Sequence, residues 1–259
     1  MHVLSRMTPE LKAVKKWQKK ASARETDRIF VTEGIRMFRE LPRERIRKTV
    51  VSRTFLSAHP EIVPDLVVTD DLFASISETE TPQGILAVAD AFTYTLEDIL
   101  SVPDALVLIL ENVQDPGNCG TMVRQAEAAG ASGVVFAGAC ADIYNPKTLR
   151  ATMGSVFRVP HVRTDSALPV LREIRKRGGR SCAAYLTGSV AYDTLPYTGM
   201  TAFLIGNEAR GLTEETAENA DFRIRIPMMG QVESLNAAAA ATVLLFEAAR
   251  QRRKIVTEI

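Results

Sequence analysis

Residues able to bind or position a polar substrate gather in three short blocks in the second half of this 259-residue chain. The blocks span residues 112–124, 205–212 and 226–236, and each combines glycine with Asn, Glu, Arg or Ser. Each block follows a short apolar run and precedes a helical pattern. Amide, carboxylate, guanidinium and hydroxyl groups placed in this way are typical of a polar site on loops at strand ends. The sequence therefore predicts one site built from three loops.

The first block contains a turn and the start of a helix. We expect the preceding apolar strand to end at Leu110 and residues 115–117 to form the turn. Asn118 is a favourable residue for the helix N-cap, and Arg124 lies six residues further on, so that both side chains could meet one polar group. The alternative is a capped helix with a surface arginine. The glycine spacing does not match the G-x-G-x-x-G fingerprint of dinucleotide-binding loops.

The second and third blocks add carboxylate, hydroxyl and amide groups. The run Gly206-Asn207-Glu208 follows an apolar strand, and glycine at such a point often marks a ligand lying against the backbone. Glu208 could instead form an ion pair with Arg210. Ser234 and Asn236 stand at the start of an alanine-rich helix, for which the alternative is a capped, tightly packed helix without a catalytic role.

Charge is unevenly distributed, although the formal net charge is only +1. Residues 1–50 hold 14 Lys+Arg against 6 Asp+Glu, whereas residues 51–100 hold 1 against 9. Several lysines fall on one predicted helix that begins at Thr8-Pro9, namely Lys12, Lys15, Lys16, Lys19 and Lys20. A basic face of this kind is expected of a phosphate-binding protein, and the alternative is a solvated helix face.

Other features exclude several classes of protein. No apolar stretch is long enough to cross a membrane, and the N-terminus lacks the apolar core of a signal peptide. Cys119, Cys140 and Cys182 are odd in number and lack metal-ligand spacing, and the three histidines are scattered. The cysteine pattern is typical of a reduced protein with unpaired thiols, so we expect a cytoplasmic protein without a metal site.

Strand and helix patterns alternate along the chain, which indicates an α/β protein whose second half contains a mostly parallel sheet. A first alternation ends near residue 90, residues 93–104 interrupt the rhythm, and a second alternation begins with the apolar run 105–110. We predict a domain over 1–92, a linker over 93–104 and a second domain over 105–259. In the second domain, helices are expected at about 118–129, 146–155, 166–177, 213–219 and 235–253.

The three blocks resemble, in order and spacing, the motifs of the SpoU (TrmH-like) family of RNA ribose 2′-O-methyltransferases, part of the SPOUT superfamily. The residues that carry the resemblance are Asn118 to Arg124, Ile205 to Leu212, and Ile226 to Asn236. Residues 30–36 and 77–88 resemble the substrate-binding domain that precedes many SpoU catalytic domains. The resemblance implies a small N-terminal α/β RNA-binding domain and a C-terminal α/β-knot domain, in which the chain forms a trefoil knot.

The same resemblance implies methyl transfer from S-adenosyl-L-methionine to a ribose 2′-hydroxyl in RNA. The implied catalytic residues are Arg124, Asn118, Glu208, Ser234 and Asn236. The implied cofactor-binding residues are Thr187, Gly206, Ile226, Met228 and Leu235. Arg124 is the candidate base of the family, but the pKa of arginine lies above ~12. We therefore expect Arg124 to bind the adjacent phosphate and steer the hydroxyl, while the other four residues hold Arg124 and the ribose.

The resemblance also implies a homodimer through the C-terminal domain. Ribosomal (23S) RNA is the expected substrate, because minimal tRNA-modifying members of the family tend to lack the N-terminal domain. A tRNA substrate, an antibiotic-resistance role on the same class of rRNA, and a non-catalytic RNA-binding factor in ribosome assembly stay open as alternatives.

Overall fold

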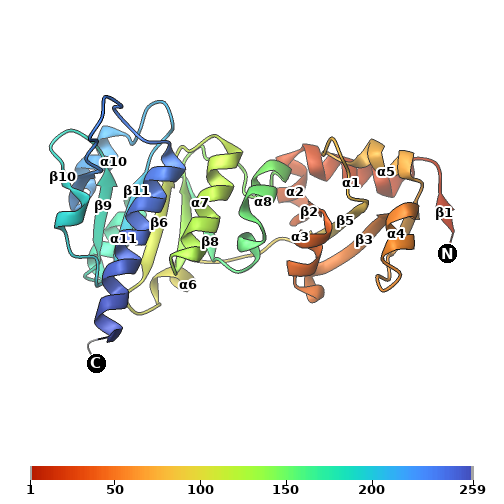
Figure 1. Ribbon diagram of the computed structural model, residues 1–259, viewed down its shortest axis with the longest axis horizontal. Helices are drawn as coiled ribbons and strands as arrows, with labels where there is room; N and C mark the ends of the chain where they lie inside the picture. The colour runs from red at the N-terminus through yellow and green to blue at the C-terminus, as the bar shows by residue number, and fades with distance from the viewer. Residues whose placement is uncertain (1, 258–259) are drawn as a thin grey trace. The chain divides into compact units, whose positions relative to one another are not determined.

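The computed structural model describes residues 2–257, with side chains described as far as Arg253, and its contacts divide the chain into two compact units. The first unit holds the chain up to residue 92 together with residues 142–157. The second unit holds residues 93–141 and the chain from residue 158 onward. Figure 1 shows the elements of both units and labels most of them.

The first unit is built on a five-stranded sheet in the order β1-β4-β3-β5-β2. Strand β5 is antiparallel to β2 and β3, whereas β4 is parallel to β1 and β3. The strands are β1 (Val3–Leu4), β2 (Ile29–Glu33), β3 (Ile46–Ser52), β4 (Leu66–Val68) and β5 (Ile85–Asp90). The helices are α1 (Pro9–Lys19), α2 (Ala21–Asp27), α3 (Ile35–Glu40), α4 (Arg53–Ala58), α5 (Asp70–Ile76) and α8 (Pro146–Thr152).

The predicted start of α1 is confirmed. Thr8 is the N-cap, its hydroxyl accepts a hydrogen bond from the Leu11 amide at 3.3 Å, and Pro9 is the first helical residue. Leu11 and Val14 repeat at helical spacing and lie in an apolar cluster with residues of α5 and the sheet. Lys12 and Lys16 of α1 are exposed, whereas Lys15 Nζ reaches α5 and donates to Ser75 O at 2.7 Å.

Residues 142–157, which the sequence pattern places in the second domain, pack instead with the first unit. Leu149 of α8 lies in one apolar cluster with Phe30 and Phe157, and the rings of Phe30 and Tyr144 stack at 4.8 Å. The Arg24 Nε donates to Asp142 Oδ2 at 3.0 Å. These apolar side chains are buried against β2, and helical periodicity alone does not reveal which sheet receives them.

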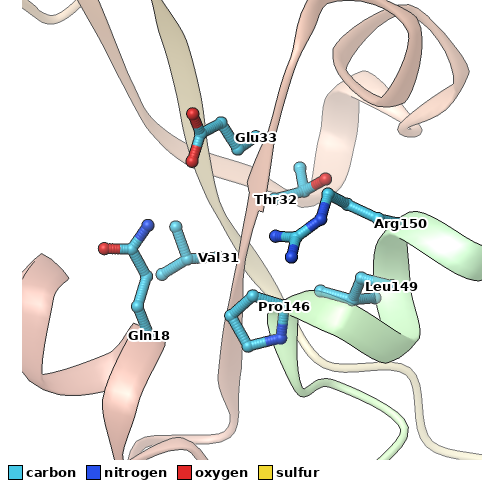
Figure 2. Close-up of a pocket in the computed structure, with 7 residues that line it drawn as sticks. All are labelled: Gln18, Val31, Thr32, Glu33, Pro146, Leu149 and Arg150. Carbon is cyan, nitrogen blue, oxygen red and sulfur yellow. The ribbon is translucent and has the colours of Figure 1, made fainter. Parts of the chain in front are cut away.

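A small cavity lies between α1, β2 and α8, with room for about one water molecule. Figure 2 shows Gln18 on α1, Thr32 and Glu33 on β2, and Arg150 on α8 around this space. Three buried oxygens at the cavity have no hydrogen-bond partner among the described residues: Gln18 Oε1, Thr32 Oγ1 and Glu33 Oε2. Buried polar atoms are rarely left unpaired in folded proteins, so this cavity is suited to a polar occupant such as water.

The second unit is built on a seven-stranded sheet in the order β10-β12-β9-β11-β6-β7-β8, in which every strand pair is parallel. The strands are β6 (Leu106–Glu111), β7 (Gly133–Ala137), β8 (His161–Thr164), β9 (Arg180–Ala184), β10 (Val190–Ala191), β11 (Thr201–Ile205) and β12 (Phe222–Arg225). The helices are α6 (Leu96–Leu100), α7 (Pro116–Ala128), α9 (Leu168–Lys176), α10 (Glu214–Asn219) and α11 (Ala237–Thr257).

Helices cover both faces of this sheet, as the alternating pattern predicts. Helices α7 and α11 pack side by side (Figure 1), and Val107 and Ile109 of β6 join an apolar cluster with residues of α6, α9 and α10. Strands β8 and β10 do not stand out in the sequence as apolar runs, because β10 is only two residues long and β8 is partly polar. The knotted path of the chain stays a prediction. None of the described helices is long and apolar enough to span a membrane.

The expected linker over residues 93–104 contains a helix of the second unit. Thr95 and Asp98 form a capping box at the start of α6, and Ile99 and Leu100 are buried in the core. Leu96, Ile99 and Leu100 have helical spacing, and one short turn of helix was too brief to stand out as a periodic pattern.

Candidate active site

The three polar blocks meet at one edge of the seven-stranded sheet. Neighbouring strands in this sheet are parallel, so the carboxyl ends of β12, β9, β11 and β6 lie next to one another. The blocks follow β6, β11 and β12, and Thr187 lies in the loop after β9. In open α/β sheets, ligands bind outside the carboxyl ends of the strands, so this edge is the candidate site.

Three predicted site residues form a chain of hydrogen bonds across these loops. Asn118 Nδ2 donates to Glu208 Oε1 at 3.0 Å, and Asn236 Nδ2 donates to Asn118 Oδ1 at 3.1 Å. Asn236 Oδ1 in turn accepts from the backbone amides of Ala238 and Ala239, which start α11. The first turn of α7, the loop after β11 and the start of α11 are therefore tied together.

Asn118 has a different position in α7 from the one predicted. The N-cap is Asp115, whose carboxylate accepts from the Asn118 amide at 2.7 Å, and Pro116 is the first helical residue. Asp-Pro is a favourable start for a helix. The Asp side chain accepts a hydrogen bond from a backbone amide of the first turn, and proline has no amide hydrogen at a position where that hydrogen would have no partner within the helix. The Asn118 side chain is consequently not used for capping and is available to Glu208 and Asn236.

Glu208 accepts hydrogen bonds from several donors of the first block. Besides Asn118, the backbone amides of Asp115 and Gln114 donate to its carboxylate at 3.1 and 3.3 Å. Burial raises the pKa of Glu208, but the hydrogen bonds from Asn118 and from the nearby backbone amides outweigh it and hold the pKa below its ordinary value. The carboxylate is thus ionised at neutral pH. Glu208 forms no ion pair with Arg210 among the described contacts, so that alternative is wrong.

A second set of polar contacts, which the sequence analysis did not predict, holds the loops in place. Asn207 Nδ2 donates to the Asn112 carbonyl at 2.8 Å, and Asn112 Oδ1 accepts from the Ala139 amide at 2.8 Å. Asn112 has a positive φ of 55°, which asparagine tolerates better than most residues. The buried carboxylate of Glu111 accepts from the Thr213 amide at 2.8 Å. Glu111 could have been identified from the sequence, because it is a charged residue directly at the end of an apolar run.

Gly206 is needed for a contact within the protein. A Cβ atom at this position would lie 2.1 Å from the backbone of Gly211 and of Leu212. The loop closes there because the Asn207 amide donates to Gly211 O at 3.0 Å and the Gly211 amide donates to Asn207 O at 2.8 Å. The sequence predicts a ligand lying close to the backbone at Gly206, but here the protein's own backbone occupies that position. Gly206 itself is buried.

Arg124 and Ser234 stand outside the hydrogen-bonded chain. Both are exposed, and neither forms a hydrogen bond or ion pair among the described residues. Six residues of helix turn the chain through 600°, so Arg124 points about 120° away from Asn118 around α7 and lies ~9 Å further along it. The expected grip of Asn118, Glu208, Ser234 and Asn236 on Arg124 is therefore not seen in this chain, and the Arg124 guanidinium is open to solvent.

Comparison with known proteins identifies the family. Residues 105–246 match the model of the SpoU rRNA methylase family, and residues 8–87 match the MRM3-like substrate binding domain. The chain belongs to the SpoU rRNA methylase family. It is 34% identical over 243 residues to the 23S rRNA (guanosine(2553)-2′-O)-methyltransferase RlmP of Bacillus subtilis, which covers 90% of this chain and 94% of the relative.

Two further relatives are similar to this chain, one named for its RNA substrate and one solved with its cofactor. The 23S rRNA (uridine(2479)-2′-O)-methyltransferase of Streptomyces viridochromogenes is 35% identical over 193 residues, 72% of this chain and 67% of the relative. The structure of the SpoU methyltransferase AviRb from the same organism, in complex with AdoMet, has a TM-score of 0.85 at 28% identity and covers 95% of this chain and 99% of that one. The fold is thus that of SpoU methyltransferases over nearly the whole chain.

The residues expected to bind S-adenosylmethionine lie in loops at three adjacent strand ends of this SpoU domain. Thr187 follows β9, Gly206 follows β11, and Ile226, Met228 and Leu235 follow β12. The same loops carry apolar side chains that the protein leaves exposed, namely Leu186, Met229 and Val232. Apolar side chains beside polar backbone groups suit a ligand with an adenine ring and an aliphatic methionine chain. The residues present therefore fit the cofactor.

The cysteines contribute packing and no reactive group. All three thiols are free and buried. Cys119 Sγ donates to the Val113 carbonyl at 3.3 Å below the first block, and burial raises the pKa of Cys119 to about 12. A thiol in this state stays protonated and unreactive at neutral pH. Among the described residues, no cluster of His, Cys, Asp or Glu is suited to hold a metal ion.

Proposed function

We propose that this protein methylates the 2′-hydroxyl of one ribose in 23S ribosomal RNA, with S-adenosyl-L-methionine as the methyl donor. Support comes from the full-length similarity to a 23S rRNA 2′-O-methyltransferase. The observation that carries the proposal is the chain of hydrogen bonds from Glu208 through Asn118 to Asn236, since it joins the three family motifs at one edge of the sheet.

The bound cofactor supplies a methyl group on a sulfonium, so the main task of the protein is to orient the ribose hydroxyl. Each side-chain amide carries two donor hydrogens and an acceptor oxygen with two lone pairs. Asn118 uses one hydrogen on Glu208 and one lone pair on Asn236, and Asn236 uses one hydrogen on Asn118. Each asparagine therefore retains one N–H for the ribose, and Asn118 retains an acceptor.

Arg124 is proposed to bind the phosphate next to the target ribose. Its guanidinium is exposed and engaged by no described residue, and a planar fork of donors matches a phosphate. The charge-neutral asparagines do not take up a proton, so the hydroxyl proton would leave to solvent or to that phosphate. Ser234, which is also exposed, is proposed to contact the ribose from the loop before α11.

The first unit is proposed to supply affinity for rRNA. It matches a substrate-binding domain and contains the strongly basic segment of the chain. The presence of a separate substrate-binding unit favours rRNA over tRNA as the substrate. We further propose that two copies pair through the second unit, since the large apolar side chain of Phe246 on α11 is 42% exposed, and that the protein acts in the cytoplasm. Sedimentation at micromolar concentration tests the dimer, and a stable monomer would contradict it.

The function is tested by mapping 2′-O-methyl groups on 23S rRNA with and without this protein, and by transfer of labelled methyl from S-adenosylmethionine to unmodified 23S rRNA or tRNA. We expect that one 2′-O-methyl group of 23S rRNA is missing when this protein is absent, and that labelled methyl is transferred to rRNA but not to tRNA. Labelling of tRNA alone would favour the alternative substrate. Cofactor binding without any RNA labelling would favour a role in ribosome assembly.

A further inference from the structure

A groove of about 220 Å³ opens on the surface of the first unit, in residues 38–63. Its lining consists of Phe38, Arg39, Arg43, Glu61, Ile62 and Val63. Phe38 and Ile62 are half-buried, whereas Val63 is 86% exposed, which is unusual for a branched apolar side chain. The volume is below the ~300 Å³ at which pockets for drug-sized ligands begin, so the groove suits one flat ring and its substituents.

The groove contains two exposed arginines. Arg39 and Arg43 are exposed and form no hydrogen bond or ion pair with described residues. Nearby arginines are engaged: Arg45 lies over the Phe92 ring at 4.2 Å, and the Arg47 Nε donates to Asp90 at 2.6 Å. The guanidinium groups of Arg39 and Arg43 are therefore available to an anion, and phosphate matches their planar donors.

Glu61 supplies a carboxylate acceptor beside these arginines. Its Oε1 lies 3.3 Å from His59 Nδ1, and the His59 ring packs on Phe55 at 4.4 Å, which fixes this side of the groove. The backbone amide of Glu61 lowers the pKa of its carboxyl group, and His59 and Arg39 lower it further. The carboxylate is thus ionised at neutral pH and can only accept hydrogen bonds.

We propose that this groove binds one unpaired nucleotide of the RNA substrate and that guanosine is the nucleotide it fits. Arg39 and Arg43 hold the phosphates, and the face of the base lies against Phe38, Ile62 and Val63. Single-stranded bases are commonly read along their Watson–Crick edges. Guanine presents two neighbouring N–H donors there, which match the two oxygens of Glu61, whereas the single N–H of uracil is flanked by carbonyls that the carboxylate repels. The inference rests on the proposed RNA substrate and identifies one nucleotide-binding site for it.

The test measures fluorescence anisotropy of the full-length protein with short single-stranded oligonucleotides, either all uridine or uridine with one central guanosine. The Arg39→Ala/Arg43→Ala variant is expected to weaken binding of both RNAs about tenfold. The dependence of log K on log salt should fall by about 1.4, because each lost single-strand phosphate contact removes ~0.7. The matched control is Arg36→Ala/Arg53→Ala, which removes two exposed arginines that do not line the groove and whose side chains form no hydrogen bond or ion pair with described residues. This control should change affinity much less.

The Glu61→Ala variant tests recognition of the base separately from binding of the phosphates by Arg39 and Arg43. It should abolish the preference for guanosine while leaving binding of the all-uridine RNA unchanged or slightly tighter. Equal affinity of the wild-type protein for both RNAs, or equal losses in the groove and control variants, would overturn the proposal. Methyl transfer to 23S rRNA by the wild-type protein is measured in parallel, so that a wrong groove is distinguishable from a wrong function. Circular dichroism of each variant confirms that it is folded.

Discussion

The side chain of Asn118 donates to Glu208 across 3.0 Å, although the two residues are 90 positions apart in the chain. The contact requires β6 and β11 to be neighbours, because each residue lies just beyond one of these strands. Asn236 joins the same contact from the start of α11. One asparagine thus fixes the relative positions of all three family motifs, and the predictions below depend on this arrangement.

Arg124→Ala is expected to lower methyl transfer by ~100-fold or more, the scale at which loss of a substrate-positioning group acts. Cofactor affinity and stability should change little, because the Arg124 side chain is exposed and contacts no described residue. Arg124→Lys should also be inactive, since one ammonium does not reproduce the planar fork. Single-turnover rates together with calorimetry of S-adenosylmethionine binding check this, and near-normal turnover by either variant would exclude the proposed role.

Glu208→Gln is expected to lower the free energy of unfolding by about 1 kcal/mol, because a neutral amide replaces a carboxylate that accepts four N–H groups in an exposed site. The pKa of Glu208 is depressed in the folded protein. Its stabilising contribution is therefore present above the ordinary pKa of 4.5 and is lost as pH falls through the lower folded value.

Urea unfolding of the wild type and of Glu208→Gln at several pH values measures this difference. The gap in unfolding free energy should be constant near neutral pH and should narrow in the acid range. Glu218→Gln, an exposed glutamate on α10, is the control. A gap that widens on acidification would contradict the assigned hydrogen bonds.

The basic face of α1 is expected to contribute to RNA binding through Lys12, Lys16 and Lys20. Of the lysines considered from the sequence, Lys15 Nζ donates to Ser75 O at 2.7 Å and Lys19 lies 4.0 Å from Glu78. Replacing Lys12, Lys16 and Lys20 by alanine should reduce the salt dependence of RNA binding by about 2, with ~0.7 per contact.

Neutralising Lys15, Lys16, Lys19 and Lys20 together should also weaken RNA binding, with part of the loss due to the broken contact with α5. Cofactor affinity should be unchanged in both variants, because the cofactor loops belong to the second unit. If the salt dependence of RNA binding in these variants equals that of the wild type, the basic face of α1 does not contact RNA and is only solvated.

Gly206→Ala is expected to destabilise the protein by ~1–3 kcal/mol, the cost of forcing extra volume into a packed site. The added Cβ would lie 2.1 Å from two backbone atoms, and backbone cannot move aside as a flexible side chain does. Gly230→Ala is the matched control in the third block, because no atom lies within 4 Å of its Cβ position. Thermal unfolding of the two variants should differ clearly, and equal melting temperatures would contradict the close packing at Gly206.

The small cavity of Figure 2 is expected to hold one ordered water that forms a hydrogen bond with at least one of the unpaired oxygens of Gln18, Thr32 and Glu33. Thr32 is 2% exposed, so its hydroxyl has no access to bulk solvent. A high-resolution crystal structure should show density within hydrogen-bonding distance of at least one of these oxygens, and an empty cavity would contradict the expectation. A direct contact between Arg150 and Glu33 that fills the space would refute this expectation.

Local chemistry in the sequence determined much of the secondary structure. Continuous apolar runs marked β6 and β11, because strands of a parallel sheet are buried on both faces. Thr8 and Thr213 cap α1 and α10 through contacts within three residues. The order of the three polar blocks also identified the family and hence the cofactor, since motif spacing is a property of the chain itself.

Contacts between distant segments were decided only by the tertiary structure. Periodicity shows that α8 has a side to bury, but the aromatic cluster around Phe30 that receives it belongs to the first unit, not to the second domain in which the sequence pattern placed α8. Gly206 was recognisable as important, whereas the partner that approaches it became clear only once Gly211 was placed beside it. Asn118 was identified from the sequence, but its role changed because Asp115 caps the helix and sheet order brings Glu208 within reach. Strand order and burial partners depend on packing free energy summed over the whole fold, which no single window of sequence contains.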